Sequence, residues 1–113
     1  MGVDVVLYRQ VRGGPGRGRP SVVAAQLVPD PDDVLLDLLA RVRGGGRTPT
    51  LDRVDPLGEL LVGPEQAPRL LAELDCLAEI ARTPTEVTQV QRVVRLVQRC
   101  ARERDLEIRF EGD

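Results

Sequence analysis

The side chains available for chemistry in this sequence are carboxylates, guanidinium groups and two thiols. The chain has no histidine and no lysine, and its one serine, Ser21, lies in an apolar stretch. It therefore has no imidazole base, no Schiff-base lysine and no Ser-His or Cys-His nucleophile pair. We expect a protein that is not an enzyme and has no catalytic residues.

One group of carboxylates surrounds a turn signature. Asp52 and Glu59 flank Asp55-Pro56-Leu57-Gly58, which has Asp, Pro and Gly at the positions that a type I turn favours. Solvated carboxylates at a turn are the ordinary interpretation, and a metal site or an acid pair is the alternative. We expect no metal here, because Asp55 already has a role in the turn.

A second acidic group lies near the C-terminus. Glu107, Glu111 and Asp113 alternate with Arg109, so a strand would place all four on one face. Such a face is ordinarily solvated, but a partner protein can also bind it. From the two groups we predict a partner-binding set: Asp52, Asp55, Glu59, Arg109, Glu111 and Asp113.

The segment Val11 to Pro20 is rich in Gly, Pro and Arg. An apolar strand rather than a helix follows it, which favours a hairpin loop over a phosphate-binding loop. The arginines in and before it are the candidates for a basic arm: Arg9, Arg12, Arg17 and Arg19. No aromatic residue interleaves with them to stack on a base, so we do not expect a nucleic-acid partner.

The two cysteines, Cys76 and Cys100, fall on opposite arms of a predicted helical hairpin. With the turn near Thr83, the helical rise places them about 15 Å apart, beyond the reach of a disulfide. Without histidine they cannot complete a usual zinc site. We expect buried, reduced thiols and no cofactor.

The composition favours one globular domain over residues 1–113. Hydrophobic residues make up 42% and charged residues 30% of the 113 residues, and the net charge is −2. Tyr8 and Phe110 are the only aromatic residues, so the core is expected to be aliphatic. No signal peptide and no membrane-spanning stretch is apparent, which makes the cytoplasm the expected compartment.

A helical pair is predicted over Gly63 to Asp105, with two amphipathic helices joined at Arg82-Thr83-Pro84. We expect this pair to supply most of the core on which the predicted strands pack. In the first helix, apolar residues recur at three- and four-residue spacing from Ala67 to Ala81. Thr83-Pro84-Thr85-Glu86 reads as a capping box at the start of the second. The second helix is expected to bury a valine-rich stripe: Val87, Val90, Val94, Val97 and Ala101. Val93 and Leu96 then lie beside the stripe, with apolar area left for another chain.

Strands are predicted on both sides of the helical pair. The patterns favour Val3–Tyr8, Ser21–Val28, Thr50–Val54, Glu59–Val62 and Leu106–Phe110. Another helix is expected after Asp30, which is its natural cap, with Pro31 in the first helical position. The order predicts an α+β fold: a small, mostly antiparallel sheet covered on one face by about three helices, two of them forming a hairpin.

A resemblance narrows the expected function. The run Leu51 to Glu59 resembles an Asp-Pro-Tyr-Gly-Asp turn of small bacterial immunity-like proteins, with Leu57 in place of the aromatic residue and Glu59 in place of the last Asp. The similarity extends to Gln66–Leu74 and to the ending Phe110–Asp113. It implies a protein that neutralises a cognate toxin of a polymorphic toxin system.

The sequence thus favours a non-enzymatic, cytoplasmic protein-binding module, specifically an immunity protein that covers the active site of a toxin. The alternative is a homo-oligomeric structural or regulatory module, motivated by Val93 and Leu96. An enzyme with a carboxylate-bound metal is the third hypothesis, which the missing acid–base groups disfavour.

Overall fold

The computed structural model describes residues 2–11 and 21–112, which form four strands and three α-helices. The strands are β1 (Val3–Val11), β2 (Ser21–Val28), β3 (Glu59–Val62) and β4 (Leu106–Gly112). The helices are α1 (Val34–Val42), α2 (Ala67–Ile80) and α3 (Pro84–Arg102), with short 3-10 segments at Pro31–Asp33 and Leu51–Arg53. The loop predicted within 11–20 lies outside the described residues, except for Val11.

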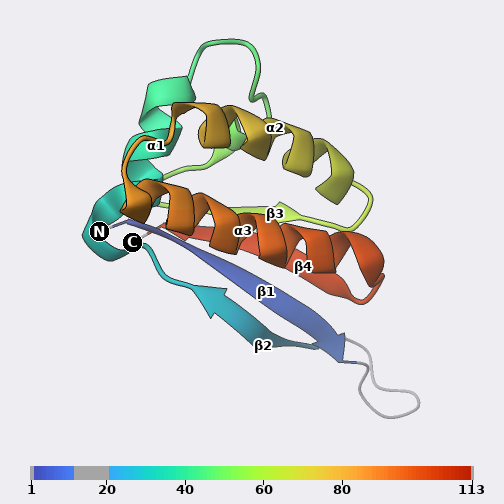
Figure 1. Cartoon of the computed structure of the whole chain (residues 1–113). Coiled ribbons are helices and arrows are strands. Elements are labelled where there is room, and N and C mark those ends of the chain that lie inside the picture. The colour runs from blue at the N-terminus through green and yellow to red at the C-terminus, as the bar shows by residue number, and fades with distance from the viewer. Residues whose placement is uncertain (1, 12–20, 113) are drawn as a thin grey trace.

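The strands form one antiparallel sheet in the order β2-β1-β4-β3, and the helices lie on one face of it (Figure 1). The predicted α+β architecture is therefore confirmed, as is the helical hairpin of α2 and α3. The last strand in the chain, β4, lies in the interior of the sheet, and β2 and β3 form its two edges.

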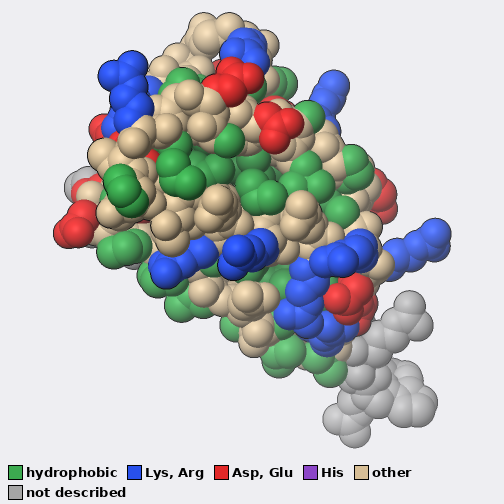
Figure 2. Space-filling model, in the orientation of Figure 1, with side chains coloured by type: hydrophobic (Ala, Val, Ile, Leu, Met, Phe, Trp, Pro, Cys, Tyr) green, Lys and Arg blue, Asp and Glu red, His purple; other side chains and the backbone are tan. Residues whose placement is uncertain are grey.

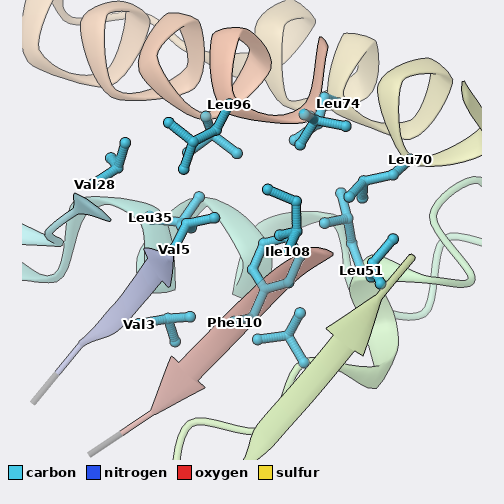
Figure 3. Packing of buried hydrophobic residues seen from close by; sticks show 14 of the residues in the cluster. Val3, Val5, Val28, Leu35, Leu51, Leu70, Leu74, Leu96, Ile108 and Phe110 are labelled. Atoms are coloured by element: carbon cyan, nitrogen blue, oxygen red, sulfur yellow. The ribbon is translucent and has the colours of Figure 1, made fainter. Parts of the chain in front are cut away.

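Alternation along the strands directs one set of side chains towards the helices. Val3, Val5 and Leu7 of β1 and the apolar residues of β4 are fully buried there. They meet side chains from all three helices, as Figure 3 shows for Leu35, Leu70, Leu74 and Leu96. The core is aliphatic, as predicted, apart from Phe110.

The turn between α2 and α3 has the predicted capping box. The Thr83 hydroxyl accepts a hydrogen bond from Glu86 N at 3.1 Å, and the Glu86 carboxylate accepts from Thr83 N at 3.2 Å and from Arg82 N at 2.9 Å. Arg41 of α1 donates to the other oxygen of Glu86 at 2.6 Å. One carboxylate of α3 thus joins α1 to the turn between α2 and α3.

These contacts predict an acid-sensitive component of stability. Hydrogen bonds from the backbone of Arg82 and from Arg41 lower the pKa of Glu86 from 4.5 to about 2. Because the folded-state pKa is depressed, the stabilisation is complete above the ordinary pKa and is lost as pH falls from about 5 towards 2. In urea denaturation, wild type should exceed Glu86→Gln in stability at neutral pH, and the difference should shrink through this range. A difference that is independent of pH would contradict the assignment; Glu65→Gln, at an exposed residue, is the control.

One predicted strand is wrong. Thr50–Val54 is not extended but contains the 3-10 segment Leu51–Arg53. The buried Glu73 of α2 accepts hydrogen bonds from Thr50 N and Leu51 N, both at 2.9 Å. This contact between segments distant in the sequence holds the 3-10 turn in place of a strand.

The expected stripe on α3 is also wrong in part. Val93 and Leu96 are fully buried, whereas Val87 is exposed. The helix packs against the sheet and against both α1 and α2, so it buries a broader arc than one stripe. The apolar area that motivated the homo-oligomer hypothesis is therefore inside the core.

The start of α1 differs from the prediction in detail. Pro31 opens a 3-10 segment, and the α-helix begins at Val34, after Asp32 and Asp33 with φ of 57° and 56°. Asp30 still serves the helix N-terminus, because its carboxylate accepts hydrogen bonds from the first-turn backbone. None of the helices in residues 2–11 and 21–112 is both long and apolar enough to span a membrane.

Candidate protein-binding surface

The face of the sheet turned away from the helices, here called the open face, carries a set of polar side chains. The register places Asp4, Val6 and Tyr8 of β1 beside Glu111, Arg109 and Glu107 of β4. On the other side of β4, Glu59 pairs with Glu111 and Leu61 with Arg109. The alternation that buries one side of each strand thus brings charges from three strands together on the other side.

Arg109 lies at the centre of this arrangement. Its Nε is 2.7 Å from Glu107 Oε2, and its Nη1 is 3.6 Å from Glu59 Oε1. Its guanidinium carbon lies 4.6 Å from the centre of the Tyr8 ring, within cation–π range. We call Tyr8, Glu59, Glu107, Arg109 and Glu111 the open-face cluster.

The tyrosine extends the cluster to the third carboxylate. The Tyr8 hydroxyl donates a hydrogen bond to Glu111 Oε2 at 2.6 Å, and this bond, reinforced by desolvation, raises the pKa of Tyr8 above 10.0. The hydrogen bond with Glu107 raises the pKa of Arg109. At neutral pH Tyr8 is thus a neutral hydrogen-bonding group and Arg109 a fixed cation.

The cluster is packed rather than loose. Glu107 is only 5% exposed although no described helix covers this face; Arg109 and Gln10 both donate hydrogen bonds to its carboxylate. Val6, beneath Arg109 in the same cross-strand row, is equally buried. The cluster contains three carboxylates, two of them beside the Arg109 guanidinium and one bonded to Tyr8, so it is ordered and net negative.

The structure gathers three of the six residues predicted from the sequence, Glu59, Arg109 and Glu111. Asp55 lies at the start of the turn that leads into β3, and its carboxylate accepts a hydrogen bond from Leu57 N at 2.8 Å. Asp52 instead accepts hydrogen bonds from the Thr48 hydroxyl and Gly44 N, which hold the loop after α1.

Asp113 lies outside the described residues. The turn itself is as predicted, closed by a bond from Gly58 N to Asp55 O at 3.1 Å.

Sequence reasoning missed Tyr8 and Glu107 as members of the site. It placed Tyr8 at the end of the predicted strand Val3–Tyr8, but it did not identify the strand that lies beside it. It also missed two exposed apolar neighbours, Leu57 in the turn and Leu61 on the open face, which are 76% and 49% exposed. The alternation of Leu61 with the buried Leu60 and Val62 was the available signal.

Gly112 determines how the turn meets the cluster. Its N–H donates to Gly58 O at 2.8 Å, and a Cβ at this position would lie 2.1 Å from Pro56 O. Gly112→Ala should therefore push the turn away from β4 and lower the free energy of unfolding by about 1–3 kcal/mol. Chemical denaturation measures this, with Gly63→Ala as the control, because a Cβ at Gly63 meets nothing within 4 Å. Equal stability of the two variants would contradict the close approach.

The structure also bears on the candidate metal ligands and on the two thiols. Within the described residues, no three His, Cys, Asp or Glu side chains are placed to hold a metal ion together. Cys76 and Cys100 are both buried and unpaired, as predicted. Burial raises the pKa of the Cys100 thiol to about 11, so it is protonated at neutral pH.

Comparison of the chain with protein-family models, with curated proteins and with solved structures finds no match.

Proposed function

We propose that this protein is a non-enzymatic binding module that contacts a partner protein through its open face. The observation that carries the proposal is the open-face cluster, an ordered negative surface assembled from three strands. Its carboxylates are held in position by Arg109 and Tyr8 before any partner arrives, which reduces the entropy lost on binding.

The chemistry of the cluster specifies the partner surface. Glu59 and Glu111 retain solvent contact at the rim, where they suit a basic surface and speed its approach. Tyr8 and Arg109, at the centre, are of the residue types enriched among interface hot spots. Leu61, the cross-strand partner of Arg109, and Leu57 in the turn before β3 supply exposed apolar contact area.

In its narrower form, the proposal is that the module is a cytoplasmic immunity protein and that the basic surface is the catalytic cleft of a cognate toxin. The likeness of the 51–59 run to immunity-like proteins supports this form. The negative charge of the open face supports it too, because a toxin that acts on an anionic substrate needs a basic cleft.

A paired pull-down tests the proposal. The tagged protein is purified from its native host, and the proteins that accompany it are identified by mass spectrometry. The test variant is Glu59→Gln/Glu111→Gln, in which the amide oxygen at 111 can still accept from Tyr8. The control is Glu65→Gln/Asp75→Asn, which removes the same charge from exposed residues elsewhere.

A stoichiometric partner should be captured by wild type and control, and the affinity of the purified pair should fall about tenfold or more in the test variant. A partner bound equally by all three proteins would rule out the open face as the surface. Capture of no partner would contradict the binding function. If the purified partner is a toxin whose activity remains when bound, the immunity form is wrong.

The homo-oligomer alternative has lost its motivation, because Val93 and Leu96 are buried within one chain. Light scattering of the purified protein tests this alternative directly, and a strict monomer at high concentration would exclude it.

A further inference from the structure

The two edges of the sheet differ sharply in protection. β3 is an edge of four residues and includes the charged Glu59. β2 is an edge of eight residues, Ser-Val-Val-Ala-Ala-Gln-Leu-Val, with no charge and no proline. Natural edge strands are usually short, charged or interrupted, because their outer backbone groups otherwise pair with another strand. By this criterion, the outer backbone groups of β2 are available to pair with another strand.

The side chains of β2 are exposed on both faces of the strand, and no other strand of residues 2–11 and 21–112 pairs with its outer edge. Val23 is 51% exposed on the side towards the helices, and Leu27 is 54% exposed on the open-face side. The register gives these sides, because Val23 pairs with Arg9 and Leu27 pairs with Val6. A strand added outside β2 would gain backbone hydrogen bonds and apolar contacts on both faces.

Three arginines of α3 run alongside this edge. Arg92, Arg95 and Arg99 follow i, i+3, i+7 spacing, so they share one side of the helix. Arg99 Nη1 lies 3.3 Å from Gln26 Oε1 of β2, and Gln89 donates to Pro29 O at 2.7 Å, so that side borders β2. Figure 2 shows the basic side chains in a line along α3, above apolar side chains of β2. We call Arg92, Arg95 and Arg99 the arginine row.

Most of the row's charge is available to a ligand. In the described part of the chain, Arg92 and Arg95 form no ion pair, whereas Arg99 pairs with Glu103 at 3.3 Å. Next to Arg92 the surface is hollowed, and the hollow is lined by Pro31, Pro84, Thr85, Thr88, Gln89 and Arg92. The strip from Gln26 to this hollow combines an unpaired strand edge with positive charge.

The spacing of the row matches an extended chain. At about 1.5 Å per helical residue, Arg92 and Arg99 are separated by roughly 10 Å along the helix axis. Alternate side chains of a strand recur about every 7 Å on one face. Two alternate side chains therefore fit within the length of the row, so acidic residues at two alternate positions of an added strand can meet it.

We propose that the β2 edge binds an extended polypeptide segment whose acidic side chains, at alternate positions, pair with Arg92, Arg95 and Arg99. A second copy of this chain fits less well. Two β2 strands paired antiparallel would continue the sheet with the helices on the same side. Both arginine rows would then border the same seam, where like charges repel. The site does not rest on the proposed function, because it uses a different edge and the opposite charge.

A designed peptide tests the proposal. The probe is a fluorescein-labelled eight-residue peptide of alternating valine and glutamate, and its binding to the full chain is followed by fluorescence anisotropy. One comparison peptide replaces glutamate by lysine. Another carries N-methyl groups on two adjacent central amides, which removes a donor from each edge of the strand.

The protein variant is Arg92→Glu/Arg95→Glu, and the matched control is Arg53→Glu/Arg69→Glu, at exposed arginines elsewhere. Circular dichroism verifies that both are folded. We expect the glutamate peptide to bind wild type and control, and to bind the variant about tenfold or more weakly. The lysine and N-methylated peptides should also lose about tenfold or more, and backbone amide shifts should concentrate in Ser21–Val28.

Several outcomes would overturn the proposal. The glutamate and lysine peptides could bind equally well, wild type and Arg92→Glu/Arg95→Glu could bind the glutamate peptide with equal affinity, or N-methylation could leave the affinity of the peptide unchanged. Any one of these results would contradict the proposal. Concentration-dependent association of the protein alone, with amide shifts confined to β2, would assign the edge to a second copy instead.

Discussion

Replacing Asp30 by alanine should lower the free energy of unfolding by about 3–5 kcal/mol, because the buried Asp30 carboxylate accepts hydrogen bonds from three backbone N–H groups. Asp30 Oδ2 accepts from Val3 N at 3.0 Å and Leu36 N at 3.0 Å, and Oδ1 accepts from Leu35 N at 2.6 Å. The substitution removes all three of these bonds at a buried site, where water cannot easily replace the carboxylate.

Denaturation in urea measures the loss. Asp30→Asn separates the roles of the two oxygens, since an amide offers a single acceptor and its NH₂ faces donors; its stability should fall between wild type and Asp30→Ala. Asp75→Ala, at an exposed residue of α2, is the control and should change stability by less than about 0.5 kcal/mol. If Asp30→Ala were as mild as this control, the carboxylate would not be holding α1 to β1.

Glu73→Ala should cost about 2–4 kcal/mol through the same physics at the other end of the helical layer. Glu73 is 4% exposed, and its Oε1 accepts from both Thr50 N and Leu51 N. Its Oε2 has no hydrogen-bond partner among the described residues. The loss of two acceptor contacts therefore outweighs the relief of one unsatisfied oxygen.

Glu73→Gln gives the sharper test. The amide oxygen can still accept from Thr50 and Leu51, and the buried charge is gone, so this variant should stay within about 1 kcal/mol of wild type. Glu79→Ala, on the exposed side of the same helix, removes only a surface ion pair with Arg47 and should cost less than about 1 kcal/mol. Equal losses for Glu73→Gln and Glu73→Ala would show that the charge, rather than the acceptor, stabilises the 3-10 turn.

The two buried carboxylates, Asp30 and Glu73, tie the helices to the sheet and to the loop before the 55–58 turn. Asp30 joins the start of β1 to α1, and Glu73 joins α2 to the segment that precedes the 55–58 turn. Each replaces a missing stretch of regular hydrogen bonding with a side-chain acceptor. The strands that carry the open-face cluster and the β2 edge are thereby fixed relative to the helices.

Negative and positive charge lie on opposite sides of the sheet. The open face carries Glu59, Glu107 and Glu111 together with Arg109, and the helix side beside β2 carries the arginine row. With a net charge of −2, the chain is close to neutral overall, so this separation is invisible in its composition. Partners of opposite charge can therefore be sorted to different surfaces of one small domain.

Local patterns in the sequence determined most of the elements. Strict alternation in Leu106–Phe110, three- and four-residue spacing in α2, and the Thr83–Glu86 capping box depend on near neighbours, and each was predicted correctly. The same alternation placed Glu59, Arg109 and Glu111 on exposed strand faces. Propensity and periodicity act within a few residues, which is why they can be read from one sequence.

Only the tertiary structure decided which of these residues meet. The antiparallel register of β1 with β4 brings Tyr8 to Glu111 across 103 positions, and no local pattern encodes that pairing. The wrong strand at Thr50–Val54 has the same origin, since Glu73 from α2 supplies the acceptor that its backbone needs. The burial of Val93 and Leu96 likewise follows from the packing of α3 against the sheet, α1 and α2, because the width of a buried arc depends on how many neighbours surround a helix.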